Sequence, residues 1–178
     1  MLLGAIAAAA IGSFTYLQRT EPTWWARLWY PLQYQAIVRG HAEHYRLNPA
    51  LLAAVIEQES KFKADARSST GAIGLMQLQP ATAKGIALHT GGNNFVLADL
   101  EDPEINVRYG SWYLRHLLDR YHDERLALAA YNAGQANVDE WRRKGEDVQF
   151  PETRAYVSRV ERLKDIYRRA YASELGIK

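Results

Sequence analysis

One carboxylate in this sequence of 178 residues comes directly after an apolar run and has the spacing of a buried side chain. Glu59 lies four residues after Val55 and three after Ile56, so a helix through this stretch places it on the apolar face. Glu57 is expected to point away from this apolar face. Apolar surroundings and the negative end of a helix dipole both raise the pKa of a carboxyl group. A raised pKa suits a general acid, but a glutamate near a helix end also reaches water or caps a neighbouring amide, and both interpretations stay open.

The residues that follow Glu59 predict a loop whose apolar side chains cover another part of the structure. The stretch 65–80 reads DARSSTGAIGLMQLQP, which has the Ser, Gly and Pro content of a loop. Gly71 and Gly74 carry no side chain, so the backbone there is able to approach a ligand closely. The same loop encloses an apolar patch formed by Ile73, Leu75 and Met76. The helix and the loop together have the character of a cleft wall.

The elements that must position these residues are nearly all helical. Apolar residues recur at three- and four-residue spacing from about residue 34 to the end, without sustained strand-like alternation. Asn48 and Pro49 form a cap and a first-turn proline, which predict a helix ending near Ser60. Comparable signals predict helices over about 80–88, 103–121, 124–133, 136–144 and from 152 onward. The predicted fold class is mainly α, in one globular domain.

Two of these helices carry clear inner faces. In the stretch 103–121 the expected inner residues are Ile105, Tyr109, Trp112, Leu117 and Tyr121. In the last helix they are Tyr156, Val160, Leu163, Tyr167 and Ala170.

The N-terminal segment differs from the rest of the chain. Met1–Leu17 has no charged side chain, which is typical of a signal peptide or a short anchor and also fits a buried helix. We therefore divide the chain into 1–28, a signal or anchor segment with its linker, and 29–178, the folded domain. Of the aromatic residues Trp24, Trp25, Trp29 and Tyr30, at least half are expected to pack onto that domain. This segment favours export to the cell envelope, as a secreted or membrane-associated protein.

Composition and motifs favour a protein without nucleic acid, metal or cofactor. The net charge is only +2, which gives no case for nucleic-acid binding, and the chain has no cysteine. Neither a HExxH pair, nor a phosphate-binding loop, nor a dinucleotide fingerprint occurs in the sequence. His41 and His44 share helical spacing but lack nearby acidic or cysteine partners in sequence, so both are expected to face solvent or cap a helix.

Four short motifs carry a family resemblance. In chain order they are Glu59-Ser60, Gly74-Leu75-Met76-Gln77, Ala130-Tyr131-Asn132-Ala133-Gly134 and Glu152-Thr153-Arg154-Ala155-Tyr156-Val157. Together they resemble the signature of the soluble lytic transglycosylase, or goose-lysozyme-like, catalytic domain, over about residues 30–171. The resemblance implies a single lysozyme-like helical domain with an active-site cleft.

The resemblance also implies an activity: cleavage of the β-1,4 bond between N-acetylmuramic acid (MurNAc) and N-acetylglucosamine (GlcNAc) in peptidoglycan strands. Glu59 would protonate the glycosidic oxygen and then take the proton of the muramyl C6 hydroxyl, which attacks C1 and leaves a 1,6-anhydro end. No metal or cofactor takes part in this scheme.

Further residues are expected to bind the substrate. Ser60 would orient the sugar or Glu59, and Gln77 and Asn132 offer amides to sugar hydroxyl and acetamido groups. Met76 would form an apolar wall beside Leu75, while Gly74 shapes the backbone. Tyr131 and Tyr156 would line the cleft and hold Glu59 or the sugar, although Tyr156 also fits an inner helix face.

Two alternatives remain at this point. Hydrolysis of a glycoside usually uses two carboxylates, and no second acid has the right context, since Asp65 between Lys63 and Arg67 fits a salt-bridged loop residue better. A hydrolytic muramidase would need such a second acid. A non-catalytic peptidoglycan-binding module would need no desolvated carboxylate. The sequence identifies no protein partner.

Overall fold

The computed structural model describes residues 11–17, 20–92 and 94–177. Its helices are α2 (Thr23–Trp29), α3 (Gln35–His44), α4 (Pro49–Ser60), α5 (Pro80–Thr90), the 3-10 helix η1 (Leu97–Glu101), α6 (Pro103–Tyr121), α7 (Glu124–Ala133), α8 (Gln135–Lys144) and α9 (Pro151–Ala170). The helices predicted from residue 49 onward are confirmed within two residues at their starts and ends, whereas α2, α3 and η1 had not been delimited from the sequence. The residues Met1–Ala10 of the apolar N-terminal segment lie outside the described residues.

Helix starts follow the capping residues in the sequence. The Asn48 side chain accepts hydrogen bonds from the amides of Ala50 and Leu51, and Pro49 occupies the first turn of α4. Asp102 and Asp123 cap α6 and α7 in the same way. Lys61 ends α4 in the left-handed conformation, with φ of 53°.

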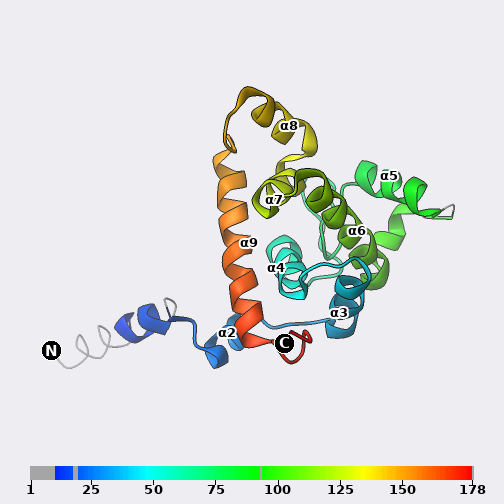
Figure 1. Ribbon diagram of the computed structural model, residues 1–178. Coiled ribbons are helices and arrows are strands. Elements are labelled where there is room, and N and C mark those ends of the chain that lie inside the picture. Colours follow the sequence, from blue (N-terminus) through cyan, green and yellow to red (C-terminus); the bar gives the residue numbers. More distant parts are fainter. Residues whose placement is uncertain (1–10, 18–19, 93, 178) are drawn as a thin grey trace.

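Helix α4 runs through the centre of the molecule, with α3, α6, α7 and α9 around it (Figure 1). Its residues from Ala50 to Ile56 are at most 1% exposed. The long helix α9 lies along α4, and its expected inner face is confirmed, since Tyr156, Val160, Leu163, Tyr167 and Ala170 are all buried. This packing fixes the end of α4 against the first turns of α9.

A second, smaller apolar cluster lies beside this core. It joins the loop after α4 to α5, η1 and α6, and its buried members are Ile73, Leu78, Ala83, Ile86, Ala87, Leu100 and Tyr109. Along α6, Tyr109, Leu117 and Tyr121 are buried as expected, whereas Ile105 and Trp112 are only partly covered. In Figure 1, α5 lies on the side of the molecule opposite α9.

The loop between α4 and α5 has no strand, and only isolated antiparallel bridges join Arg67 to Ile73 and Ile73 to Leu78 among its described residues. Two backbone hydrogen bonds between Ile73 and Leu78, at 3.1 and 3.0 Å, close a tight turn over residues 74–77. The turn holds the second motif in one conformation.

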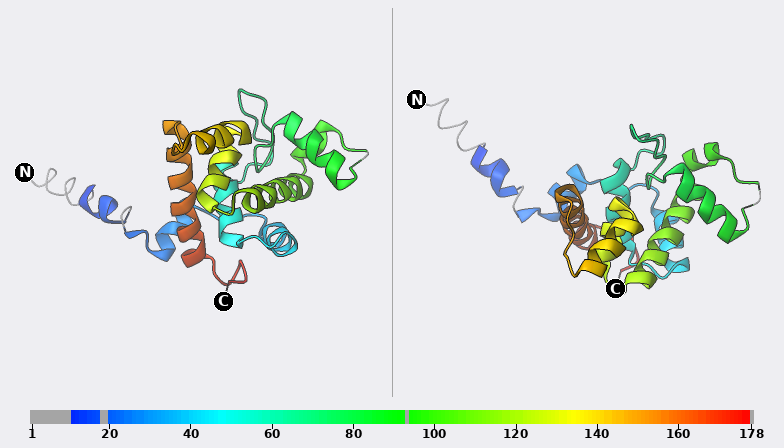
Figure 2. Two further views of the ribbon diagram at one scale, coloured as in Figure 1. Left: turned by 45° about the horizontal axis from the view of Figure 1, so that its top comes forward. Right: turned by 90° about the horizontal axis from the view of Figure 1, so that it is seen from above.

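The N-terminal helix α2 packs against α9, and the preceding residues 11–17 extend away from the body of the molecule (Figure 2). Ala26 belongs to the main core and Tyr30 packs against it, whereas Trp24 and Trp29 are exposed. Packing thus begins a few residues before position 29, and the division of the chain at residue 28 stays a prediction. Among the described residues, no helix has the length and apolar character needed to cross a membrane.

Candidate active site

Glu59 and Tyr156 meet where α4 ends beside α9. The Tyr156 hydroxyl donates a hydrogen bond of 2.6 Å to Glu59 Oε1. The Tyr156 side chain is buried, so it packs in the core and also contacts Glu59. Glu59 itself is partly exposed.

The environment of Glu59 favours the neutral acid. Burial raises its pKa from the ordinary 4.5 to about 7, and the hydrogen bond from Tyr156 partly opposes this rise because it stabilises the carboxylate. Neither influence comes from a charged side chain. The expected rise in the pKa of Glu59 is therefore present, and its main cause is desolvation.

Glu57 points away from the helix face that carries Glu59, as expected, but it is buried there rather than in solvent. It is 8% exposed, and burial raises its pKa to about 7 as well. The Tyr167 hydroxyl donates to Glu57 Oε2 at 3.3 Å. The reason is that α4 is enclosed on nearly all sides, so a position two residues from Glu59, about 200° around the helix, is also buried.

A buried asparagine that the sequence analysis missed holds the loop of the second motif. Asn106, on α6, accepts a 2.8 Å hydrogen bond from the Met76 amide and donates to the carbonyls of Ile73 (2.9 Å) and Leu100 (2.8 Å). Its side chain is 0% exposed. Its position three residues before buried Tyr109 is the signal in the sequence that could have revealed it.

Gly74 leaves room for this asparagine. Its φ is +81°, and a Cβ atom there would collide with the Asn106 side-chain amide and with the Leu100 carbonyl. The close approach of backbone and asparagine therefore requires glycine at this position.

The Leu75 and Met76 side chains are fully buried, so the expectation of an apolar wall formed by Met76 against the sugar does not hold. Met76 packs onto Gly110 of α6. Gln77 has φ of 46°, and its side-chain amide donates to the carbonyls of Ala66 and Gly74, both at 3.0 Å. The buried side chains and these bonds fix the shape of the turn.

Tyr131 connects this turn to Glu59. Its hydroxyl donates to the Met76 carbonyl at 2.7 Å. Burial and, second, the charge of Glu59 raise the pKa of Tyr131 well above its usual value, so the phenol stays protonated. Its neighbour Asn132 is exposed and accepts a 2.8 Å hydrogen bond from the buried hydroxyl of Thr153, a residue not singled out from the sequence.

Ser60 is placed differently from its expected role. Its hydroxyl donates to the Ile56 carbonyl at 3.2 Å, within its own helix, and the side chain is buried. It caps no other group and does not donate to Glu59.

A pocket of about 260 Å³ lies between the turn, α6 and the end of α7. Its lining residues are Gln77, Leu78, Gln79, Thr82, Tyr113, Tyr131, Asn132, Ala133 and Gly134. Tyr131 belongs to this lining, and the charge of Glu59 raises its pKa. It therefore links the carboxyl group to the pocket. The second and third motifs are thus brought together around one hollow.

Two other sequence expectations concern residues away from this pocket. Asp65 is exposed, as expected for a loop residue, but the expected salt bridge is not formed among the described residues, because Arg67 pairs with Glu101 instead. His41 was expected at the surface or as a cap, but it is buried, with its Nε2 atom 2.8 Å from Glu104 Oε1. The acidic partner comes from α6, too distant in sequence to be recognised from local spacing.

The chain has clear relatives among known proteins. A family model described as the transglycosylase SLT domain matches residues 36–152. The transglycosylase of Enterobacteria phage PRD1 is 39% identical over 108 residues, which are 60% of this chain and 37% of the phage protein. The soluble lytic murein transglycosylase of Salmonella typhimurium is 31% identical over 156 residues, covering 78% of this chain and 23% of that protein.

A solved structure has the same fold. The X-ray structure of the lytic transglycosylase Slt from Pseudomonas aeruginosa, an inactive mutant in which a glutamine replaces a glutamate, matches with a TM-score of 0.74 and 33% identity. The match covers 80% of this chain and 25% of that one. This chain therefore spans less than two fifths of the relatives it matches. With the family model covering most of its helical core, the chain belongs to the transglycosylase SLT domain family.

Proposed function

We propose that this protein is a peptidoglycan lytic transglycosylase, which cleaves the β-1,4 bond between MurNAc and GlcNAc and leaves 1,6-anhydro-MurNAc ends. The observation that carries the proposal is the state of Glu59: a carboxyl group with pKa about 7 that is held by Tyr156 and acts on Tyr131, which lines a pocket built from the family motifs. The relatives' names, a murein transglycosylase among them, support the same substrate.

In the proposed reaction Glu59 acts twice. It first gives its proton to the glycosidic oxygen as the bond to C1 breaks. The resulting carboxylate then accepts the proton of the C6 hydroxyl, whose oxygen bonds to C1 and closes the anhydro ring. The attacking hydroxyl already belongs to the sugar, so it needs only to be oriented, and one carboxyl group is sufficient.

The surroundings of Glu59 suit this double role. A pKa about 7 lets the carboxyl group be protonated before the first step and ionised after it, near neutral pH. The hydrogen bond from Tyr156 fixes the carboxylate oxygen that accepts it. Tyr156 is thus proposed as a positioning residue.

We assign substrate contacts to the pocket. Gln77, Tyr131 and Asn132 line it and offer polar groups to sugar hydroxyl and acetamido groups. Gly74, Leu75 and Met76 act through the backbone of the turn, because their side chains are absent or buried. For Ser60 we propose a structural role in the last turn of α4 instead.

The proposed location follows from the substrate. Peptidoglycan lies in the cell envelope, so the domain must act on the outer side of the cytoplasmic membrane. The apolar segment within residues 1–28 is proposed to bring it there, as a signal or as an anchor.

A pair of matched variants tests the catalytic assignment. Glu59→Gln keeps the shape of the side chain but cannot donate and recover a proton, so peptidoglycan clearance should fall by roughly 100-fold or more. Glu57→Gln makes the same chemical change two residues away and should retain most activity. Equal losses in both variants would contradict the assignment, and binding without cleavage by the wild type would instead indicate a binding module.

A further inference from the structure

Large apolar side chains are exposed mainly at one end of the molecule. Among the described residues nine such side chains are exposed, and six of them fall within residues 11–29. These six are Ile11, Phe14, Tyr16, Trp24, Leu28 and Trp29, and they are 48–68% exposed. Such a concentration in so short a stretch indicates a contact surface.

The aromatic members form one continuous cluster. The ring of Trp25 lies 5.6 Å from Phe14, 5.7 Å from Trp24 and 5.6 Å from Trp29, centroid to centroid. Trp25 is buried at 8% exposure, while its three neighbours remain open to solvent. Leu28 follows Trp24 by one helical turn on the same side of α2. We call Phe14, Trp24, Leu28 and Trp29 the N-terminal aromatic surface.

The two charged side chains that the structure describes in this segment pair with α9 and the C-terminal turn. In residues 11–17 and 20–29 the charged side chains are Glu21 and Arg27. Arg27 pairs with Glu174 at 2.6 Å and donates to the Ala170 carbonyl at 3.0 Å. The side chain of Glu21 is only 8% exposed and pairs with two arginines of α9. The aromatic surface is therefore apolar without an unpaired charge among these residues.

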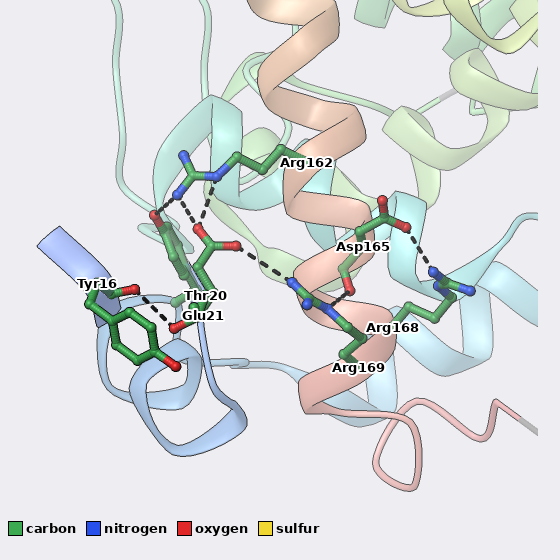
Figure 3. Close-up of polar contacts among 8 residues, drawn as sticks. Tyr16, Thr20, Glu21, Arg162, Asp165, Arg168 and Arg169 are labelled. Carbon is green, nitrogen blue, oxygen red and sulfur yellow. Dashed lines mark hydrogen bonds and ion pairs between the residues drawn. The ribbon is translucent and has the colours of Figure 1, made fainter. Parts of the chain in front are cut away.

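Ion pairs of Glu21 with Arg162 and Arg169 join the residues before α2 to α9, as Figure 3 shows. Arg162 donates to Glu21 Oε1 through Nε at 2.9 Å and through Nη2, and Arg169 lies 3.5 Å from Glu21 Oε2. Arg162 also donates to the Tyr30 hydroxyl at 3.2 Å. Four side chains from both ends of the chain thus hold α2 at a fixed place on the domain.

We propose that the N-terminal aromatic surface docks onto the surface of a lipid bilayer whose headgroups include anionic lipids. Tryptophan is the side chain best suited to the boundary between headgroups and acyl chains. Met1–Ala10, which directly precede the surface in sequence, contain no charged residue. The side chains of Arg162, Arg168 and Arg169 are 51–57% exposed in the C-terminal half of α9, and their pairs with Glu21 and Asp165, three cations with two carboxylates, leave one positive charge in excess to attract anionic headgroups.

This docking would orient the domain as well as retain it. The two arginines of α9 that bind Glu21, Arg162 and Arg169, lie about 9 and about 20 Å from Tyr156 along the helix axis at 1.5 Å per residue. Because Glu21 joins the aromatic surface to the Arg169 end, the end that contacts Glu59 is held away from the lipid. A glycan strand next to the membrane would then meet the site at a defined distance. This consequence rests on the proposed function, whereas the docking itself does not.

Vesicle binding by the full chain tests the docking. The probes are vesicles of phosphatidylcholine alone and of phosphatidylcholine with an equal part of phosphatidylglycerol. We expect the wild type to float with the mixed vesicles, and Trp24→Ser combined with Trp29→Ser to lower its partitioning by about tenfold. Leu88→Ser, a change at an 85% exposed site on α5, is the matched control and should leave partitioning unchanged.

Each outcome decides the proposal. Unaltered vesicle binding by the double tryptophan variant would overturn it, because the apolar residues before α2 would then suffice. Absence of wild-type binding would also overturn it, and dimerisation lost in the same variant would assign the surface to a second copy of the chain. Peptidoglycan cleavage, measured in parallel, reports on the proposed function separately.

The role of Glu21 has its own readout. Glu21→Gln leaves every aromatic residue in place, so vesicle binding should persist, while amide hydrogen exchange in α2 should become faster. Unchanged exchange in α2 would show that the pairs with Arg162 and Arg169 do not hold the helix.

Discussion

Tyr156 Oη lies 2.6 Å from Glu59 Oε1, and eleven residues further along α9 Tyr167 Oη lies 3.3 Å from Glu57 Oε2. One helix thus supplies a phenol donor to each of two glutamates that occupy opposite sides of α4. Both carboxyl groups have a pKa about 7, so the pKa does not tell which one is the acid. Position does: the charge of Glu59 acts on Tyr131, which lines the pocket of the motifs, whereas Glu57 lines a separate pocket beside Lys61 and Arg159.

The activity of the wild type should fall above neutral pH. If protonated Glu59 begins the reaction, kcat/KM follows the fraction of neutral acid, which halves at a pH near its pKa of about 7. Above that pH we expect a loss approaching tenfold per unit. A rate profile from pH 5 to pH 9 checks this, and constant activity up to pH 9 would exclude Glu59 as the acid.

Removing the phenol hydroxyl of Tyr156 should shift the pH at which the activity falls. The hydrogen bond from Tyr156 stabilises the carboxylate and lowers the pKa of Glu59, so Tyr156→Phe should raise this pKa and shift the falling limb to higher pH. The rate itself should drop by roughly tenfold, since Glu59 is less well held. A rate loss without any shift of the pH profile would indicate that Tyr156 acts through packing alone.

Glu57 should destabilise the fold at high pH. Its folded pKa, about 7, exceeds the ordinary 4.5, so the folded state binds more protons between these values and stability declines as pH rises through this window. Glu57→Gln removes this effect and should raise the free energy of unfolding by about 1–3 kcal/mol at pH 8, with little change at pH 4. Urea unfolding at both pH values provides the measurement. A gain of equal size at pH 4 would contradict this origin.

Gly74 and Gly71 form a matched pair for the turn. Both have positive φ, +81° and +87°, but a Cβ atom at Gly71 meets open space whereas one at Gly74 collides with Asn106 and Leu100. Gly71→Ala should cost about 1 kcal/mol of stability, the cost of the backbone conformation alone. Gly74→Ala should cost ~3 kcal/mol or more and reduce activity as the turn is displaced. Similar losses for the two variants, in unfolding and in peptidoglycan clearance, would refute the role of the close approach.

The helices could be predicted from the sequence because their signals are local. The caps at Asn48, Asp102 and Asp123 all function as their residue types indicate, and the 3.6-residue spacing of α9 correctly identified its buried face. These features depend on residues within a few positions of each other, and no knowledge of the packing partner is needed.

The site could be predicted only in part, because its details depend on contacts between distant segments. The burial of Glu57 could not be predicted because α4 is covered on nearly all sides, which its own residues do not reveal. The Met76 side chain turned inward because α6 presents Gly110 to it. Asn106 was missed because its partners lie about 30 residues earlier in the chain. The shape of the turn depends on these long-range contacts.

The most direct test of the central claim is the chemistry of the new sugar ends. Purified peptidoglycan is incubated with the wild type, Glu59→Gln and Glu57→Gln, and the products are identified by mass spectrometry. The account predicts 1,6-anhydro-MurNAc ends from the wild type and Glu57→Gln, and none from Glu59→Gln. Reducing ends from the wild type would contradict it and would require a second carboxylate across the cleft, as in a hydrolytic muramidase.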